Sequence, residues 1–202
     1  MRLGLFGGSF DPVHYGHLLL AESCREQARL DEVWFVPAAV SPFKQSQDRT
    51  SGPQRVEMLE LAIAGHETFR VSRLEIDRGG VSYTVDTLAE IKRTRPSDEL
   101  FFLLGADALE DLPAWREPKR ICELATPLVV RRPGSAEPDF SRLSEIASPA
   151  RIAEIRRCQV EMPQIGLSSR DLRRRVSEGL GIRYRTPRGV EKYIEAAALY
   201  RR

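Results

Sequence analysis

The chain has 202 residues, a length that favours one domain with a sizeable hydrophobic core. Its 42% hydrophobic and 30% charged residues are ordinary for a globular protein, and a net charge of +2 gives no reason to expect nucleic acid or a membrane as partner. The three cysteines have neither metal-ligand nor redox-motif spacing, and no apolar run approaches the length of a membrane span. We therefore expect a cytoplasmic protein with reduced thiols.

Strand and helix patterns alternate along most of the chain. In chain order the sequence predicts a strand at 2–6, a helix at 13–30, a strand at 32–37, a polar loop at 38–52, a helix at 53–65, a strand at 69–76, a turn at 77–80, a helix at 82–95 capped by Ser82, and strands at 99–105 and 126–134. Residues 134–150 show no clear pattern.

This alternation predicts the fold class. Strands separated by helices of ten or more residues are typical of βαβ units, which form a parallel sheet covered on both faces. We expect an α/β, Rossmann-like, doubly wound sheet with a small C-terminal helical part, in a single domain over residues 1–202. Ligands of such sheets bind beyond the carboxyl ends of the strands, where the unusual residues of this sequence gather.

The most unusual stretch is GGSFDPVHYGH, after the first predicted strand. Gly7 and Gly8 allow a tight turn and a close approach to a ligand, but their spacing is not the G-x-G-x-x-G of dinucleotide sites. His14 and His17 lie three residues apart, hence on one face of a helix. A helix N-terminus and imidazolium are both positive, and a bound phosphate would offset that charge and raise the imidazole pKa values. We favour a phosphate site over a pair of buried core histidines.

The same stretch resembles the signature of the nucleotidylyltransferase family, whose H-x-G-H histidines contact the phosphates of a nucleoside triphosphate. Further blocks resemble, in order, those of bacterial nicotinate-nucleotide adenylyltransferases: VPAAVSPFK, SYTVDTL, LLGADALEDLPAW, VVRRPG, LSSRDLRRRV and IRYRTPRGVEKYI. The similarity extends from Met1 to about Tyr200. It implies transfer of the adenylyl group of ATP to nicotinate mononucleotide, which gives nicotinate adenine dinucleotide and pyrophosphate in NAD biosynthesis.

The resemblance implies roles for individual residues. His14 and His17 are expected to hold the α- and β-phosphates as the catalytic pair. The ATP-binding residues implied are Gly7, Gly8, Ser9, Phe10, Gly105, Asp107, Ser168, Ser169 and Arg173. Relatives often carry Thr where this chain has Arg170, which leaves open whether Ser169 or Arg170 reaches the ligand. Mg²⁺ is expected to be held mainly by the ATP phosphates, without a dedicated protein metal site.

For the acceptor side of the site, the resemblance implies four residues. Lys44, in the polar loop, could bind the phosphate of the mononucleotide, and Tyr83 with Thr84 is expected near the nicotinate carboxylate. Trp115 could stack on the pyridinium ring as a cation–π contact, although a tryptophan is more often a core residue. We expect a preference for the nicotinate over the nicotinamide mononucleotide.

Several alternatives remain at this point. The chain could be another transferase of the superfamily, with nicotinamide mononucleotide or phosphopantetheine as acceptor, or a cytidylyltransferase. A class I aminoacyl-tRNA synthetase is disfavoured because no K-M-S-K-S stretch is present. A non-catalytic module could bind nucleotide or RNA through the arginines between Arg170 and Arg188, but Tyr184 is the only stacking aromatic residue among them. A homo-oligomer is compatible with the sequence.

Overall fold

The computed structural model describes residues 1–42, 50–131, 134 and 137–201. Its centre is a six-stranded parallel sheet whose strands lie in the order β3-β2-β1-β4-β5-β6. The strands are β1 (Arg2–Gly8), β2 (Glu32–Pro37), β3 (Phe69–Val71), β4 (Glu99–Gly105), β5 (Thr126–Arg131) and β6 (Val160–Glu161). In this order the strands are added outward from β1 in one direction and from β4 in the other, so the switch point lies between β1 and β4, where doubly wound sheets bind ligands. The predicted fold class is confirmed.

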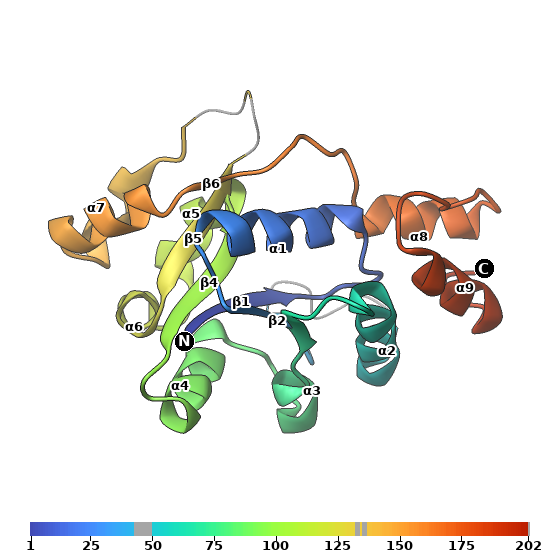
Figure 1. Cartoon of the computed structure of the whole chain (residues 1–202), viewed down its shortest axis with the longest axis horizontal. Helices are drawn as coiled ribbons and strands as arrows, with labels where there is room; N and C mark the ends of the chain where they lie inside the picture. Colours follow the sequence, from blue (N-terminus) through green and yellow to red (C-terminus); the bar gives the residue numbers. More distant parts are fainter. Residues whose placement is uncertain (43–49, 132–133, 135–136, 202) are drawn as a thin grey trace.

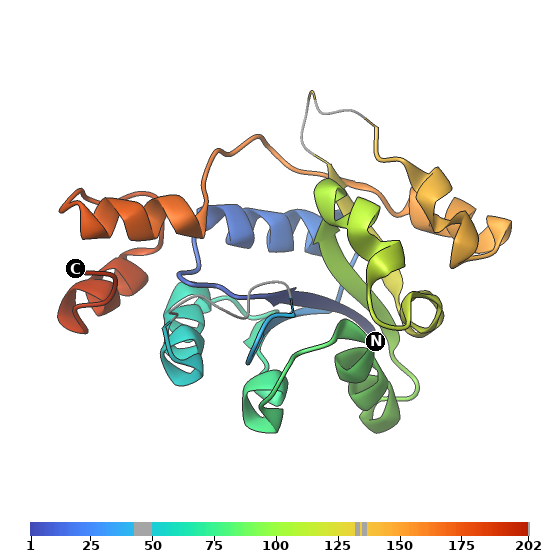
Figure 2. The ribbon, with the colours of Figure 1, turned by 180° about the vertical axis from the view of Figure 1, so that it is seen from behind.

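Helices cover both faces of the sheet (Figures 1 and 2). The helices are α1 (Tyr15–Gln27), α2 (Gly52–Ile63), α3 (Leu74–Arg78), α4 (Thr84–Thr94), α5 (Ala106–Asp111), α6 (Pro118–Leu124), α7 (Pro149–Arg157), α8 (Ser169–Ser177) and α9 (Arg188–Ala196), with short 3₁₀ helices η1 (Leu112–Ala114) and η2 (Phe140–Glu145). In Figure 1, α1 lies above the sheet and α3 and α4 lie below it, while α8 and α9 lie at the end near α2 and the start of α1.

The core is divided by the sheet into two apolar layers because residues alternate between the faces of each strand. In β4, Phe101 and Leu103 pack with α1, α2, α8 and α9, whereas Leu100, Phe102 and Leu104 pack with α4, α5, α6 and α7. All five side chains are at most 4% exposed. Burial on both faces explains why this strand reads as a continuous apolar run.

The predicted strand over residues 69–76 is wrong in its second half. The strand ends at Val71, and residues 74–78 form the short helix α3. A strand that continued would have placed Arg73 on the same buried face as Phe69 and Val71. The chain turns instead at Ser72, whose N–H donates to the carbonyl of Phe35 at 2.9 Å.

The predicted cap of α4 is also wrong. The N-cap residue is Tyr83, and the hydroxyl of Ser82 accepts a hydrogen bond from the N–H of Ala39 at 3.0 Å. The N–H of Ser82 donates to the carbonyl of Val40 at 2.8 Å. Ser82 therefore joins the segment after β2 to the segment before α4.

Three other predicted boundaries are adjusted. Helix α1 covers Tyr15–Gln27 instead of 13–30, and His14 is its N-cap residue. Strand β5 ends at Arg131, while residues 132–133 of the predicted strand lie outside the described residues. The segment without a clear pattern contains η2 and leads into α7, which is capped by Ser148.

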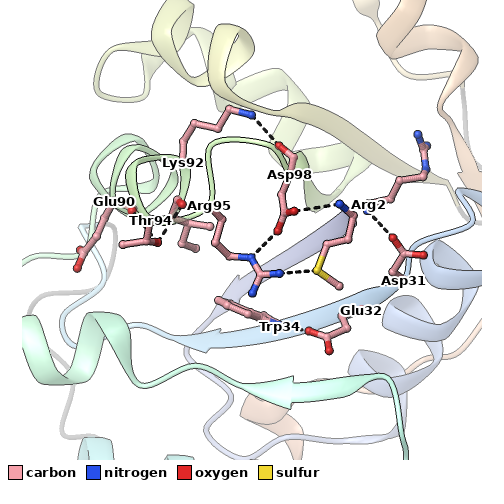
Figure 3. Close-up of polar contacts among 11 residues, drawn as sticks. Arg2, Asp31, Glu32, Trp34, Glu90, Lys92, Thr94, Arg95 and Asp98 are labelled. Atoms are coloured by element: carbon pink, nitrogen blue, oxygen red, sulfur yellow. Dashed lines mark hydrogen bonds and ion pairs between the residues drawn. The ribbon is translucent and has the colours of Figure 1, made fainter.

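A polar network joins the N-terminal ends of the strands, on the side of the sheet away from Gly8 and Gly105 (Figure 3). The amino group of Met1 donates to Asp98 at 2.9 Å, and Arg95 forms an ion pair with the same carboxylate. Lys92 donates to the carbonyl of Asp98 at 2.6 Å. This network connects β1 to α4 and β4.

In the part of the chain that the structure describes, no helix has the length and apolar character that spanning a bilayer requires.

Candidate active site

A cleft of about 650 Å³ opens beyond the carboxyl ends of β1 and β4. Its walls come from the loop after β1, the start of α1, the start of α5 and the start of α8. Ten of its lining residues were predicted from the sequence: Gly8, Ser9, Phe10, His14, His17, Gly105, Asp107, Ser168, Ser169 and Arg173. Arg170, which the sequence left open as a ligand contact, lines it as well. Eight predicted ATP-binding residues and both predicted catalytic histidines are thus brought together.

The loop after β1 depends on a glycine. The ring of Phe10 packs over Gly8, and a Cβ atom at position 8 would lie 2.9 Å from that ring. Phe10 itself has a φ of 50°, in the left-handed region, and is 1% exposed. Its ring contacts Phe6, Phe35 and His17 with centroid distances of 5.2, 5.7 and 5.1 Å. Aromatic packing of this kind holds the loop in a conformation that a non-glycine residue rarely adopts.

The two histidines stack face to face at the start of α1. Their ring centroids are 3.7 Å apart with an interplanar angle of 18°. The backbone N–H of His14 donates to Nδ1 of His17 at 3.2 Å. A backbone amide can only donate, so Nδ1 accepts and the neutral ring of His17 carries its proton on Nε2. Gly16 permits this arrangement, because a Cβ atom there would lie 3.0 Å from Nδ1 of His14.

Burial favours the neutral form of His14. The residue is 6% exposed, and desolvation lowers its pKa to about 4, with a hydrogen bond of its own backbone opposing the change. The cost of placing two stacked imidazolium rings at a positive helix end is therefore avoided by neutrality. A neutral imidazole still donates one N–H, and a triphosphate beside it would raise its pKa.

The start of α8 forms the opposite wall. Ser168 caps the helix by accepting from the N–H of Asp171 at 3.1 Å. Ser169 donates to the carbonyl of Pro12 at 2.8 Å, and Arg173 donates to the carbonyl of Asp11 at 2.6 Å. These two residues thus bind the loop after β1, while Arg170 also lines the cleft.

A second pocket of about 500 Å³ lies on the other side of β1. It shares Gly8 and Ser9 with the cleft, and Gly7, predicted to bind ATP, lines this pocket instead. The predicted acceptor residues Tyr83, Thr84 and Trp115 all line it. Lys44 lies outside the described residues.

Sequence reasoning missed two charged residues of this second pocket. Glu75 is 6% exposed and accepts a hydrogen bond from the hydroxyl of Thr87 at 2.6 Å. Burial raises the pKa of Glu75, and its hydrogen bonds to Thr87 and Ser82 oppose that change. Arg116 lies over the ring of Tyr83 at 4.7 Å. Neither could have been found from the sequence, because Glu75 was assigned to a strand and Arg116 follows Trp115 in a loop.

Comparison with known proteins shows the family of this chain. The cytidylyltransferase-like family model matches residues 5–175. A curated protein of Thermus thermophilus, described as a probable nicotinate-nucleotide adenylyltransferase, is 48% identical over 100% of both chains. One from Roseiflexus castenholzii with the same description is 46% identical over 99% of this chain and 98% of its own. The chain belongs to the cytidylyltransferase-like family, among the nicotinate-nucleotide adenylyltransferases.

The solved structure of the Plasmodium falciparum nicotinic acid mononucleotide adenylyltransferase, complexed with NaAD, has a similar fold. Its TM-score is 0.74 at 19% identity, with 98% of this chain and 97% of that chain covered. At this identity the likeness concerns the fold alone. It agrees with the Rossmann-like parallel sheet found for this adenylyltransferase.

The carboxylates of the cleft bear on how a metal ion would be held. Among the described residues no group of three or more His, Cys, Asp or Glu side chains could hold a metal ion. Asp11 and Asp107 both line the cleft, and one carboxylate oxygen of Asp11, Oδ2, is buried without a hydrogen-bond partner in the described part of the chain. Such a donor set suits an ion that arrives with the triphosphate.

Proposed function

We propose that this chain transfers the adenylyl group of ATP to nicotinate mononucleotide in NAD biosynthesis, releasing pyrophosphate and forming nicotinate adenine dinucleotide. The observation that carries the proposal is the meeting of two unlike pockets at Gly8 and Ser9. One pocket has paired imidazoles at a helix N-terminus, and the other has a tryptophan among apolar side chains. Two substrates bound there would have their phosphates side by side at the carboxyl end of β1.

The reaction asks for positioning and charge stabilisation. The phosphate of the mononucleotide attacks the α-phosphorus of ATP in line, and it is already an anion, so no general base is needed. The cleft supplies N–H donors: His17 through Nε2, His14 through its imidazole, and the free amides at the start of α8. These groups stabilise the charge on the α-phosphoryl group and on the leaving pyrophosphate.

Magnesium would enter with ATP. When bound, the ion would neutralise part of the triphosphate charge, and the free Oδ2 of Asp11 is the oxygen we propose to hold it, directly or through water. Asp107 is assigned to the ribose hydroxyls. Gly105 lines the same cleft and allows the ligand to approach the backbone closely.

The second pocket is assigned to the mononucleotide. Trp115 would stack on the pyridinium ring, and Tyr83 and Thr84 would lie beside the carboxylate. Arg116 is a cation on the wall of the same pocket, which favours a carboxylate over a carboxamide. Lys44 stays the proposed contact of the acceptor phosphate. A cytoplasmic location, a single-domain organisation and a homo-oligomer remain predictions.

The decisive experiment is an assay of pyrophosphate release from ATP and Mg²⁺ with three acceptors tested separately. We expect release with nicotinate mononucleotide, release at much lower kcat/KM with nicotinamide mononucleotide, and none with phosphopantetheine. Equal kcat/KM for the two mononucleotides would contradict the assignment of Arg116 and its neighbours. Absence of release with either mononucleotide would contradict the proposed function.

A further inference from the structure

The loop after β1 is held by side chains from distant parts of the chain. Four of its carbonyls accept hydrogen bonds from them: Ser9 from Arg55 at 2.9 Å, Asp11 from Arg173 at 2.6 Å, Pro12 from Ser169 at 2.8 Å and Val13 from Thr186 at 2.8 Å. In addition, the hydroxyl of Tyr200 donates to Oδ1 of Asp11 at 2.5 Å. Three of the four carbonyl donors and Tyr200 come from the C-terminal part of the chain.

Thr186 has a special position among these donors. It lies just before α9, is 1% exposed, and does not line either pocket. Its neighbour Arg185 accepts a hydrogen bond from the N–H of Tyr15, the first residue of α1, at 3.2 Å. Residues 185 and 186 therefore hold the chain on both sides of His14. A residue so placed cannot touch ATP, so any effect on the reaction must pass through the loop.

The bond from Thr186 acts on a single peptide group. The carbonyl of Val13 and the N–H of His14 belong to the same planar unit, in which they point in opposite directions. The carbonyl accepts from Thr186, and the N–H donates to Nδ1 of His17. Accepting a hydrogen bond polarises the peptide and strengthens the donation from its other end. Thr186 is thus linked to the ring of His17 through two hydrogen bonds and one peptide.

We propose that Thr186 is a positioning residue for His17. Its hydroxyl fixes the plane of the Val13–His14 peptide, and that peptide fixes both the orientation of the His17 ring and the nitrogen that carries its proton. Without the hydroxyl, the peptide can tilt and Nδ1 loses a well-aligned donor, so the ring populates the other tautomer, with the proton on Nδ1. In that tautomer Nε2 has no hydrogen to donate to a phosphate.

The proposal rests on the proposed function, since it concerns the transfer of the adenylyl group by the cleft that His17 lines. The two can fail separately. A wild-type protein that releases no pyrophosphate would overturn the function, whereas the tautomer of His17 can be measured in the ligand-free protein.

The test compares three substitutions of one residue. Thr186→Val keeps the shape of the side chain and removes the hydroxyl, Thr186→Ser keeps the hydroxyl, and Thr186→Ala removes both methyl and hydroxyl. Thermal unfolding shows whether each variant is folded, and the alanine variant serves if the valine variant is not. We expect kcat of Thr186→Val and Thr186→Ala to fall about tenfold, because small misplacements of a catalytic group lower the rate strongly. KM for nicotinate mononucleotide should stay unchanged, and Thr186→Ser should restore kcat.

The second readout is spectroscopic. The chain has only three histidines, so ¹⁵N-labelled histidine gives few signals, and the His17 signals are assigned by their absence from a His17→Gln sample. In the wild type we expect an unprotonated Nδ1 and a protonated Nε2 for His17. In Thr186→Val the two nitrogens should shift toward an averaged mixture of tautomers, and in Thr186→Ser they should return to the wild-type values.

Either of two results would overturn the proposal. One is an unchanged kcat in the folded variants that lack the hydroxyl. The other is a fallen kcat with the same His17 tautomer as the wild type, or with no recovery in Thr186→Ser, since a purely structural role of the side chain would give that pattern.

Discussion

The two pockets on either side of β1 differ in the forces they offer to a ligand. The larger cleft carries histidines, serines, arginines and the N-terminal ends of helices, which are hydrogen-bond donors, beside the carboxylates of Asp11 and Asp107 and several apolar side chains. The smaller pocket is lined mainly by apolar and aromatic side chains, with Glu75 and Arg116 as its charged members. The two pockets share Gly8 and Ser9 as lining residues.

This difference corresponds to the two demands of the proposed reaction. A triphosphate that changes its charge distribution needs fixed donors, and these are expected to act on the rate. An acceptor that must be distinguished from close analogues needs a shaped pocket, which is expected to act on binding. Substitutions in the cleft should therefore lower kcat, and substitutions in the smaller pocket should raise KM for the mononucleotide.

The largest expected effect comes from the cleft. Replacing His17 by Ala should lower kcat by about 100-fold or more, the loss typical of removing one donor to a developing negative charge. KM for nicotinate mononucleotide should change little, as measured by initial rates of pyrophosphate release. The matched control is His66→Gln, because His66 stacks on Phe69 at 3.7 Å and lines neither pocket. A kcat of His17→Ala within a few-fold of the wild type would contradict the assignment of the rate to the cleft and of acceptor binding to the smaller pocket.

A substitution at the shared turn should affect both pockets. Ala at position 8 would place its Cβ atom 2.9 Å from the ring of Phe10, with other ring atoms at 3.1 and 3.2 Å, so the ring or the loop must move. Overpacking of this kind destabilises by about 1–3 kcal/mol. We expect Gly8→Ala to lower kcat and to raise both KM values, and the melting temperature to fall. At Gly7 a Cβ atom meets nothing within 4 Å, so Gly7→Ala should leave the melting temperature unchanged. Effects of Gly8→Ala on only one substrate would show that the pockets are less connected than the geometry indicates.

The acceptor pocket should respond mainly through binding. Trp115→Ala removes the proposed ring contact, and a partly desolvated cation–π interaction is worth about 1–2 kcal/mol. We expect KM for nicotinate mononucleotide to rise about tenfold, with KM for ATP unchanged. Trp34→Phe is the control, since the chain has two tryptophans and Trp34 lines neither pocket. A rise of KM for ATP equal to that for the mononucleotide would assign Trp115 to general folding instead.

The sequence was sufficient for the parts of this picture that depend on local pattern. Strand β4 and the paired histidines are recognisable because burial on two faces and a three-residue spacing leave direct traces in the chain. Glu75 could not be recognised, since its role follows from a turn at Ser72 that stops the strand early. The bonds of Ser169 and Arg173 to the loop after β1 were equally out of reach, because they join residues about 160 positions apart. Tertiary contacts of that separation leave no periodicity to read.

The smallest expected effect is a pH dependence of stability that belongs to the cleft. Burial lowers the pKa of His14 to about 4, from 6.5 in the unfolded chain. Between these values the unfolded state binds a proton that the folded state does not, so the free energy of unfolding falls as the pH is lowered through this window. The stabilisation is complete above pH 6.5 and is lost toward pH 4. From the two pKa values, its loss between pH 7 and pH 5 is about 2 kcal/mol.

Urea unfolding at pH 7 and pH 5 measures this contribution. Carboxylates held by arginines, such as Asp171 beside Arg174, have lowered pKa values and also lose stabilisation in acid, so the wild-type slope alone is not decisive. The informative quantity is the loss of unfolding free energy between pH 7 and pH 5, which should be about 2 kcal/mol smaller in His14→Gln than in the wild type. ATP should make this loss smaller in the wild type, because a triphosphate beside His14 raises the pKa of His14 and lets the folded state take up the proton. Equal losses in the wild type and His14→Gln would mean that His14 takes up a proton in the folded protein as readily as in the unfolded chain, and the lowered pKa of His14 would have to be abandoned.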